Sequence, residues 1–190
     1  MLDIALRFLS ARVSSHLVQR LGAAGTNKVA LSAVVDENGK WVIGPNRLGL
    51  SVVNVEEERV LRVQLPQRVY VDGNQISLPP PLKLNLVVLL AAHFSTHDQA
   101  LGFLSHAMTC LSAQPVFSAD THADLDPRIG SLTVEMLAYG PEQLNQTWAY
   151  LGAKYLPSAL YRVRLVTLQD TQPLDVGVPV TSIETALGNP

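Results

Sequence analysis

The chain has 190 residues, of which 47% are hydrophobic and 16% charged, and its formal net charge is −2. It has no block of Lys and Arg, so the electrostatic footprint of a nucleic-acid-binding protein is missing. Cys110 is the single cysteine, which excludes an intrachain disulfide framework and a cysteine-rich zinc site. The charged fraction is below the usual ~25%, which suggests that part of the surface is buried between subunits.

The N-terminal stretch has the pattern of an amphipathic helix rather than of a signal peptide. Apolar residues recur at spacings of three and four along residues 2–21, which places them on one helix face. Asp3, Arg7 and Arg12 interrupt the apolar run, as a secretory signal would not allow. The most apolar stretch, residues 84–92, is shorter than the ~20 residues that cross a bilayer as a helix. We therefore expect a soluble protein inside the cell, without membrane insertion.

Two strands are predicted in the next part of the chain, over residues 28–35 and 48–55. A turn at residues 36–39 separates them, and residues 41–43 are expected to add a short strand. The second strand runs into four charged residues, Glu56, Glu57, Glu58 and Arg59. Such a run is usually a solvated strand end. The alternative is a polar contact between subunits, for which these residues are candidates.

Residues 67–78 are predicted to form a β-hairpin. Asp72 and Gly73 lie between two β-type segments, and this dipeptide favours the type I′ turn that joins hairpin strands. Three prolines at 79–81 follow as a stiff spacer without backbone donors. The hairpin is therefore expected to project from the body of the domain, with Tyr70 and Asp72 as candidate partner contacts.

The remaining elements alternate between strand and helix. Residues 82–92 end as a continuous apolar run, which is typical of a central strand buried on both faces. Ser95 to Asp98 resembles a capping box, so a helix is predicted to begin there and to end before Pro115. Three further elements are predicted: a strand at 131–139, a helix at 141–151 and a strand at 159–167. The fold class is α/β or α+β, with a mixed β-sheet and flanking helices in a domain of residues 1–168.

The last predicted strand carries Arg162 and Arg164 on one face, because side chains two residues apart in a strand point to the same side. A solvent-facing strand would have the same pattern. The alternative is that these arginines pair with the carboxylates at 56–58 of a neighbouring subunit.

Residues 169–190 have a different composition from the rest of the chain. Prolines and glycines interrupt regular structure, but Val176, Val178 and Val180 are apolar, unlike the residues of most disordered tails. Two interpretations have equal weight. One is a frayed C-terminus. The other is an extended arm that becomes ordered on a partner as an added strand.

His93, His97 and Cys110 are the residues most able to carry chemistry, and each has a plainer interpretation. A zinc site needs three or four converging ligands, whereas the two histidines lie across a predicted strand end and helix start. A catalytic thiol needs an activating environment, whereas Cys110 lies beside an apolar helix stripe. The sequence therefore predicts no catalytic, metal-binding or cofactor-binding residue.

Five segments between residues 2 and 168 carry a resemblance, in order: LDIALRFLSARVSSHL, SVVNVEEERVLR, LKLNLVVLLAAHF, ALGFLSHAMTCLSAQPVFS and SLTVEMLAYGPEQLNQTWAYLGAKYLPSALYRVRLVTL. NVEEER, QPVF and LNQTWAYLGAKYLPS are the most specific parts. With them the chain resembles the N-terminal domain of cap, or tail-terminator, proteins of extracellular-type contractile injection systems, such as the antifeeding prophage and the Photorhabdus virulence cassette. The hairpin with its triple proline has no place in this resemblance.

The resemblance implies a structural, non-enzymatic protein with a fold like that of phage tail terminators. Family members form a ring, expected to be hexameric, on the baseplate-distal end of the inner tube. The ring ends polymerisation of tube and sheath and joins them. The implied partners are further copies of the chain, the inner tube protein and the sheath protein. The implied location is the cytoplasm, as part of a phage-tail-like particle that is later released or held at a membrane.

Two alternative functions stay open. One is an adaptor at another level of the tube and sheath assembly. The other, from a different class, is a small enzyme that uses His93, His97 or Cys110.

Overall fold

The structure is a computed structural model, and it describes residues 1–59, 67–71, 74–168 and 175–176. Its main sheet has six strands in the order β1-β2-β5-β8-β7-β6. β1 pairs with β2 in parallel and the other neighbours are antiparallel, so the sheet is mixed, as predicted. The strands in this order are Val29–Leu31, Arg47–Glu57, Leu82–His93, Ser158–Leu168, Ser131–Leu137 and Val116–Ser118.

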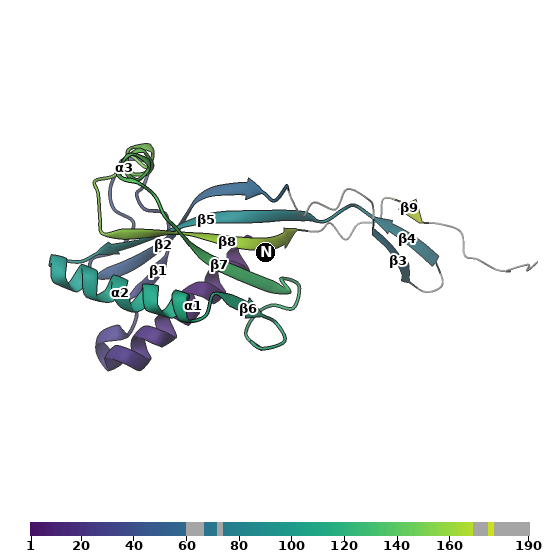
Figure 1. Cartoon of the computed structure of the whole chain (residues 1–190), viewed down its shortest axis with the longest axis horizontal. Coiled ribbons are helices and arrows are strands. Elements are labelled where there is room, and N and C mark those ends of the chain that lie inside the picture. Colours follow the sequence, from purple (N-terminus) through teal and green to yellow (C-terminus); the bar gives the residue numbers. More distant parts are fainter. Residues whose placement is uncertain (60–66, 72–73, 169–174, 177–190) are drawn as a thin grey trace, which may run out of the picture.

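Three α-helices flank the sheet in the described part of the chain (Figure 1). They are α1 (Leu2–Leu21), α2 (His97–Ala113) and α3 (Pro141–Tyr150). A short 3-10 helix, η1 (Gly22–Gly25), follows α1. Helices α1 and α2 pack together beside one face of the sheet, and α3 lies on the opposite face.

Strand β5 is the centre of the fold because both of its faces are buried. Neighbouring side chains in a strand point to opposite faces, so the apolar run of β5 contributes side chains to two hydrophobic cores. Leu86, Val88 and Leu90 join the cluster beneath α1 and α2. Val87 and Leu89 join the cluster beneath α3. The predicted central strand at 82–92 is therefore confirmed.

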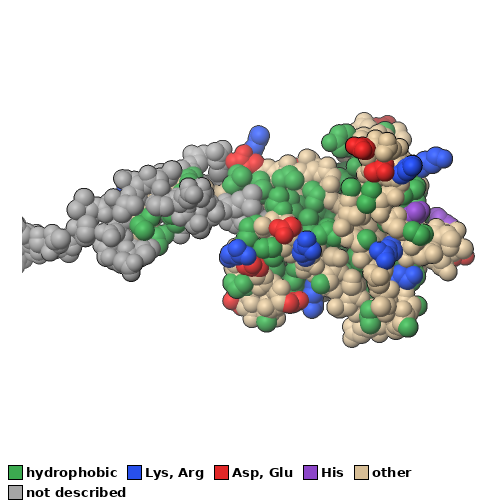
Figure 2. Space-filling view, turned by 180° about the vertical axis from the view of Figure 1, so that it is seen from behind, with side chains coloured by type: hydrophobic (Ala, Val, Ile, Leu, Met, Phe, Trp, Pro, Cys, Tyr) green, Lys and Arg blue, Asp and Glu red, His purple; other side chains and the backbone are tan. Residues whose placement is uncertain are grey.

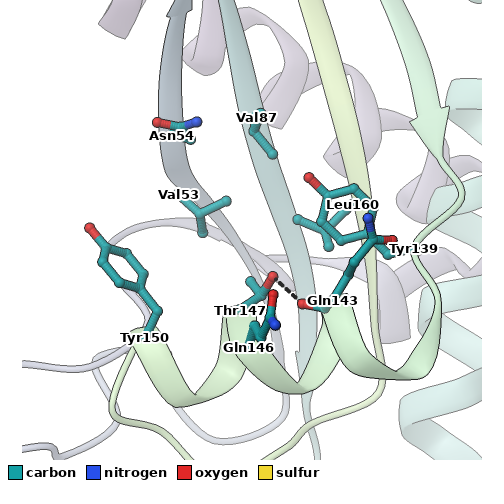
Figure 3. Close-up of a pocket in the computed structure, with 9 residues that line it drawn as sticks. All are labelled: Val53, Asn54, Val87, Tyr139, Gln143, Gln146, Thr147, Tyr150 and Leu160. Carbon is teal, nitrogen blue, oxygen red and sulfur yellow. Dashed lines mark hydrogen bonds between the residues drawn. The ribbon is translucent and has the colours of Figure 1, made fainter.

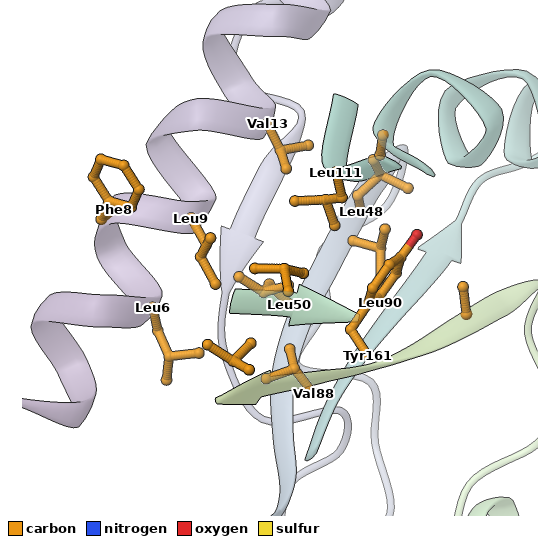
Figure 4. Packing of buried hydrophobic residues seen from close by; sticks show 14 of the residues in the cluster. Leu6, Phe8, Leu9, Val13, Leu48, Leu50, Val88, Leu90, Leu111 and Tyr161 are labelled. Carbon is orange, nitrogen blue, oxygen red and sulfur yellow. The ribbon is translucent and has the colours of Figure 1, made fainter. Parts of the chain in front are cut away.

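The larger core lies between the sheet and helices α1 and α2. The residues of α1 that enter it are spaced by three and four, as one face of a helix requires; Figure 4 shows Leu6, Leu9 and Val13 directed at the strands. Phe8 packs edge-on against Phe117 of β6, with ring centroids 5.3 Å apart. The helix predicted at 2–21 is confirmed, and its apolar side packs against the sheet.

The smaller core lies on the α3 face. Trp148 of α3 packs edge-on against Trp41, with centroids 6.3 Å apart, and Ile43 lies fully buried beside it. Helix α3 begins with Pro141, whose missing N–H is not needed at that position. Gln143 accepts a hydrogen bond from the Gly140 N–H at 3.1 Å and so caps the helix start.

A second sheet of three strands lies away from the helices, at one end of the long axis (Figure 1). β3 (Gln67–Val71) and β4 (Asn74–Leu78) pair antiparallel as the predicted hairpin. β9 (Asp175–Val176) adds to the outer side of β4. The turn residues 72–73 and residues 169–174 and 177–190 lie outside the described residues, so the C-terminal arm as a whole stays a prediction.

The structure differs from the sequence expectations at four places. The strand expected at 28–35 is only three residues long, and the one expected at 41–43 is a single bridge between Val35 and Trp41. The cap of α2 is Thr96, not Ser95, because the Thr96 hydroxyl accepts from the Gln99 N–H. Strand β6 was not expected; it exists because it pairs with β7.

Candidate interaction surfaces

Arg162 and Arg164, selected from the sequence, lie on the sheet face that carries α3. In β8, Arg162 and Arg164 follow the buried Leu160 towards the strand end nearer the second sheet. The Nε of Arg162 lies 3.9 Å from an oxygen of Glu56 in β2. A terminal nitrogen of Arg164 lies 2.9 Å from an oxygen of Glu135 in β7. These arginines face carboxylates of their own chain, and their pairing with a neighbour stays a prediction.

Amides extend this charged row across the sheet. The Asn85 side chain donates to Glu58 at 2.9 Å, and the Asn54 side chain donates to Glu56 at 3.2 Å. Glu57 and Arg59 continue the run and are exposed. Because the row is partly open to solvent, its ion pairs contribute little to folding, about 0–1 kcal/mol each.

The two arginines keep unused hydrogen-bonding capacity. The Nε atoms of Arg162 and Arg164 are buried, and within the described residues neither has a hydrogen-bond partner. The 3.9 Å separation of Arg162 and Glu56 is an ion pair by distance but is too long for a hydrogen bond. Arg162 is therefore held by its charge, whereas Arg164 lies within hydrogen-bond distance of Glu135 through its terminal nitrogen.

A groove of about 530 Å³ lies between α3 and the sheet (Figure 3). Its floor is apolar, made by Val53, Val87 and Leu160. Its rim is polar but, apart from two tyrosines, not titratable: Asn54, Tyr139, Gln143, Gln146, Thr147 and Tyr150. An apolar floor with an amide and hydroxyl rim can hold a bound group by burial and by neutral hydrogen bonds.

Of the candidates near the second sheet, Tyr70 lies in β3 and Val176 lies in β9, paired with Ile76 of β4. Asp72, Val178 and Val180 lie outside the described residues. The structure therefore places the hairpin and one part of the tail side by side. It leaves the partner contacts of these residues as predictions.

His93, His97 and Cys110 have separate surroundings. The ring of His93 hydrogen-bonds to the Ile43 carbonyl at 2.7 Å and packs against Trp41, whereas His97 is exposed at the start of α2. Burial raises the pKa of the Cys110 thiol, and its Sγ lies 3.9 Å from the Arg12 carbonyl oxygen. A raised pKa opposes the thiolate that a nucleophile needs. Among the described residues no group of His, Cys, Asp and Glu is arranged to hold a metal ion.

The outer surface of the body carries an uncharged area as well as charged ones. Figure 2 shows hydrophobic side chains gathered beside the grey segments, with acidic and basic side chains around them. Of the helices that the structure describes, none is both long and apolar enough to cross a membrane.

The chain matches the family model described as the Pvc16 N-terminal domain over residues 7–182. The chain belongs to this family. No curated protein matches it significantly.

Two solved structures share the fold of this family member. One is the sheath/tube terminator, in the extended state, of the extracellular contractile injection system PVC, with a TM-score of 0.62 and 17% identity over 95% of the present chain. The other is the tube-terminating cap of the anti-feeding prophage, with a TM-score of 0.60 and 17% identity over 93% of the chain. The chain spans only 63% and 59% of these two proteins. The predicted α+β fold and the predicted family are confirmed.

Sequence reasoning missed the α3 groove of this Pvc16 N-terminal domain protein. Tyr139 lies in the connection between β7 and α3, Gln143 lies in the first turn of α3, and the floor comes from three strands. Only the strand order brings them together. The one available signal was the polar face of the helix predicted at 141–151, opposite Trp148.

Proposed function

We propose that this chain is a structural cap, or tail terminator, of a contractile injection system. Copies of the chain form a ring, which we take to be hexameric, on the baseplate-distal end of the inner tube. The ring ends polymerisation of tube and sheath and joins the two. The observation that carries this proposal is the family match, which spans residues 7–182 and thus almost the whole chain.

The fold similarity supports the same role, because one matched structure is a sheath/tube terminator and the other is a tube-terminating cap. The proposed partners are further copies of the chain, the inner tube protein and the sheath protein. Such contacts need extended surfaces rather than activated groups. The charged row on β2, β7 and β8 and the groove beside α3 are surfaces of this kind.

We further propose that residues 169–190 act as an arm that contacts the sheath, while residues 1–168 form the body on the tube. β8 ends at Leu168, and the next described residues, Asp175–Val176, already belong to the second sheet. The cap is assembled in the cytoplasm as part of the particle, and it travels with the particle.

Deletion of the gene in a strain that makes the particles tests the main role. Without a cap, growth of tube and sheath has no defined end, so negative-stain images are expected to show particles of irregular length. Normal particle length in the deletion strain would contradict the role. A tag on the chain separates a cap from an adaptor: gold label is expected at the end distal to the baseplate, and label elsewhere along the particle would favour the adaptor.

A truncation tests the arm. A chain that ends at residue 168 is expected to cap tubes but to lose attachment of the sheath. Unchanged sheath attachment would remove the arm from the proposal and leave the ring. Alanine at His93, His97 and Cys110 together is expected to leave capping intact, whereas loss of function in a correctly folded variant would favour the enzyme.

A further inference from the structure

We propose that neighbouring copies in the ring meet at the two free edges of the six-stranded sheet, the outer side of β2 in one copy against the outer side of β7 in the next. The inference rests on the proposed function, because it takes the ring as given and identifies the surfaces that close it.

The first edge is the second half of β2. β1 pairs with β2 only from Leu48 to Leu50, and the Ser32 N–H adds one bond to the Leu50 carbonyl. Beyond this point no strand of the described chain covers the outer side of β2. Two valines there are exposed, Val52 by 38% and Val55 by 46%. This edge therefore has no paired strand among the described residues and carries two exposed apolar side chains.

The second edge is the end of β7. β6 pairs with β7 only up to Thr133, and the Val134 N–H adds a bond of 2.7 Å to the Pro115 carbonyl. Past Val134, the described strands leave the outer side of β7 uncovered. Met136 and Val116 are exposed by 52% and 53%. They border a hollow of about 430 Å³ between the end of α2 and β7.

The two edges complement each other in shape and charge. The β2 edge carries two exposed valines, Val52 and Val55, and beyond them the exposed side chain of Glu57. The β7 edge presents a hollow whose walls include Leu111, Met136 and Arg164. A valine from β2 fits an apolar hollow, and a carboxylate two residues further on can reach the arginine. Arg164 is 43% exposed even with Glu135 beside it.

The pairing of unlike edges also fits the symmetry of a ring. An edge that pairs with itself closes at a dimer, whereas a ring needs two different patches on each subunit. β2 and β7 lie near opposite sides of the sheet, with β5 and β8 between them. Each copy therefore offers one patch to each neighbour.

β2 also has a local feature that disfavours hydrogen-bonded pairing of a further strand along its outer edge. A β-bulge lies between Val52 and Asn54, and the Asn54 side-chain oxygen accepts from the Val55 N–H at 2.9 Å. A bulge and an occupied N–H discourage continuous pairing along an edge. The contact is therefore made mainly by side chains, which keeps the edge from adding strands without limit.

Cysteine cross-linking of the full chain tests this pairing. We would make Val55→Cys and Met136→Cys as separate variants, each with Cys110→Ser, and oxidise each alone and in an equimolar mixture. The mixture is expected to give a disulfide-linked dimer, and each variant alone is not. The double variant is expected to give a ladder of covalent oligomers. A bond within one copy is excluded, because two intervening strands separate the edges by about 14 Å, whereas bridged Cα atoms are within about 7 Å.

Leu101→Cys and Tyr155→Cys are the matched controls, since both are exposed, by 44% and 60%, but lie away from the two edges. A mixture of Val55→Cys and Met136→Cys that cross-links no more than the controls would overturn the proposal, as would dimers from either variant alone. The same oxidation in purified particles, together with native mass spectrometry, distinguishes failure of the edge pairing from failure of the proposed function. A ring without the cross-link removes the edge pairing only, whereas the absence of any ring removes the proposed function as well.

Discussion

Gly49 lies against Ile43 so closely that a Cβ on Gly49 would overlap the Ile43 side chain. Ile43 is fully buried and cannot move aside without disturbing the smaller core. Gly49 is therefore required by packing rather than by backbone conformation.

We expect Gly49→Ala to lower the free energy of unfolding by about 1–3 kcal/mol, the usual cost of overpacking a core. Gly102→Ala is the matched control, because a Cβ at Gly102 in α2 would meet nothing within 4 Å. Alanine in a helix interior is favoured over glycine by about 0.5–1 kcal/mol, so the control should be stabilised. Urea denaturation followed by circular dichroism measures both. Equal effects of the two changes would show that the contact with Ile43 is unimportant.

Leu90 tests the central role of β5. It is fully buried in the larger core, so Leu90→Ala is expected to cost about 2–5 kcal/mol, the loss of buried contacts plus the cavity left behind. Leu101→Ala removes the same atoms from an exposed position on α2 and should change stability by no more than about 0.5 kcal/mol. Thermal unfolding should separate the two variants, at about 2–4 °C per kcal/mol for a chain of this size.

Tyr161 gives the fold a sensitivity to alkaline pH. Its side chain is 2% exposed, its hydroxyl has no hydrogen-bond partner among the described residues, and burial raises its pKa to about 12. The unfolded chain ionises at about pH 10, so it loses its proton before the folded chain does. Stability from this group is therefore complete below about pH 10 and is lost as the pH rises towards about 12.

Tyr161→Phe is expected to keep or raise stability at neutral pH, because it removes a buried hydroxyl without a described partner. It should also reduce the loss of stability between about pH 9 and 11. Denaturation curves at both pH values measure the difference from the parent chain. Marked destabilisation at neutral pH would instead indicate that the hydroxyl makes a bond.

Asp126 and Arg128 form an exposed pair with the opposite dependence on pH. Hydrogen bonds from the Arg128 side chain, the closest at 2.6 Å, lower the pKa of the Asp126 carboxyl to about 2. Because the folded pKa is lowered, the contribution of this pair is present above about pH 4 and is lost as the pH falls towards 2. Arg128→Leu should return the pKa of Asp126 towards its ordinary value, as NMR titration of the carboxyl would detect. An unchanged pKa would contradict the assigned cause.

The parts of the fold that the sequence predicted well are those with local signals. The apolar residues from Leu6 to Leu17 recur at the period of a helix. The Asp-Gly pair predicts the hairpin from the local sequence alone. β6 has only three residues, Val116–Ser118, and becomes a strand through its pairing with residues 131–133. No local pattern of that length distinguishes a strand from a loop.

The surfaces were predicted less well because they depend on strand order. Arg162 and Arg164 were placed on one face correctly by the period of a strand. Their partners Glu56 and Glu135 follow from β2 and β7 lying on either side of β5 and β8, which local periodicity does not reveal. The same holds for the exposed edge residues, since exposure of Val55 depends on where β1 ends.

The connection between the two sheets has a mechanical consequence. The chain passes from β4 of the second sheet through the prolines at 79–81 into β5, and β8 runs towards the second sheet, with Leu82 of β5 paired to Leu168 of β8. A pull on the second sheet along the long axis therefore enters the body through three adjacent strands, β2, β5 and β8. The ladder between β8 and β7 is then loaded in shear, because β7 has no connection to the second sheet, and its hydrogen bonds are strained together rather than opened one at a time. The main sheet therefore resists tension applied at the hairpin.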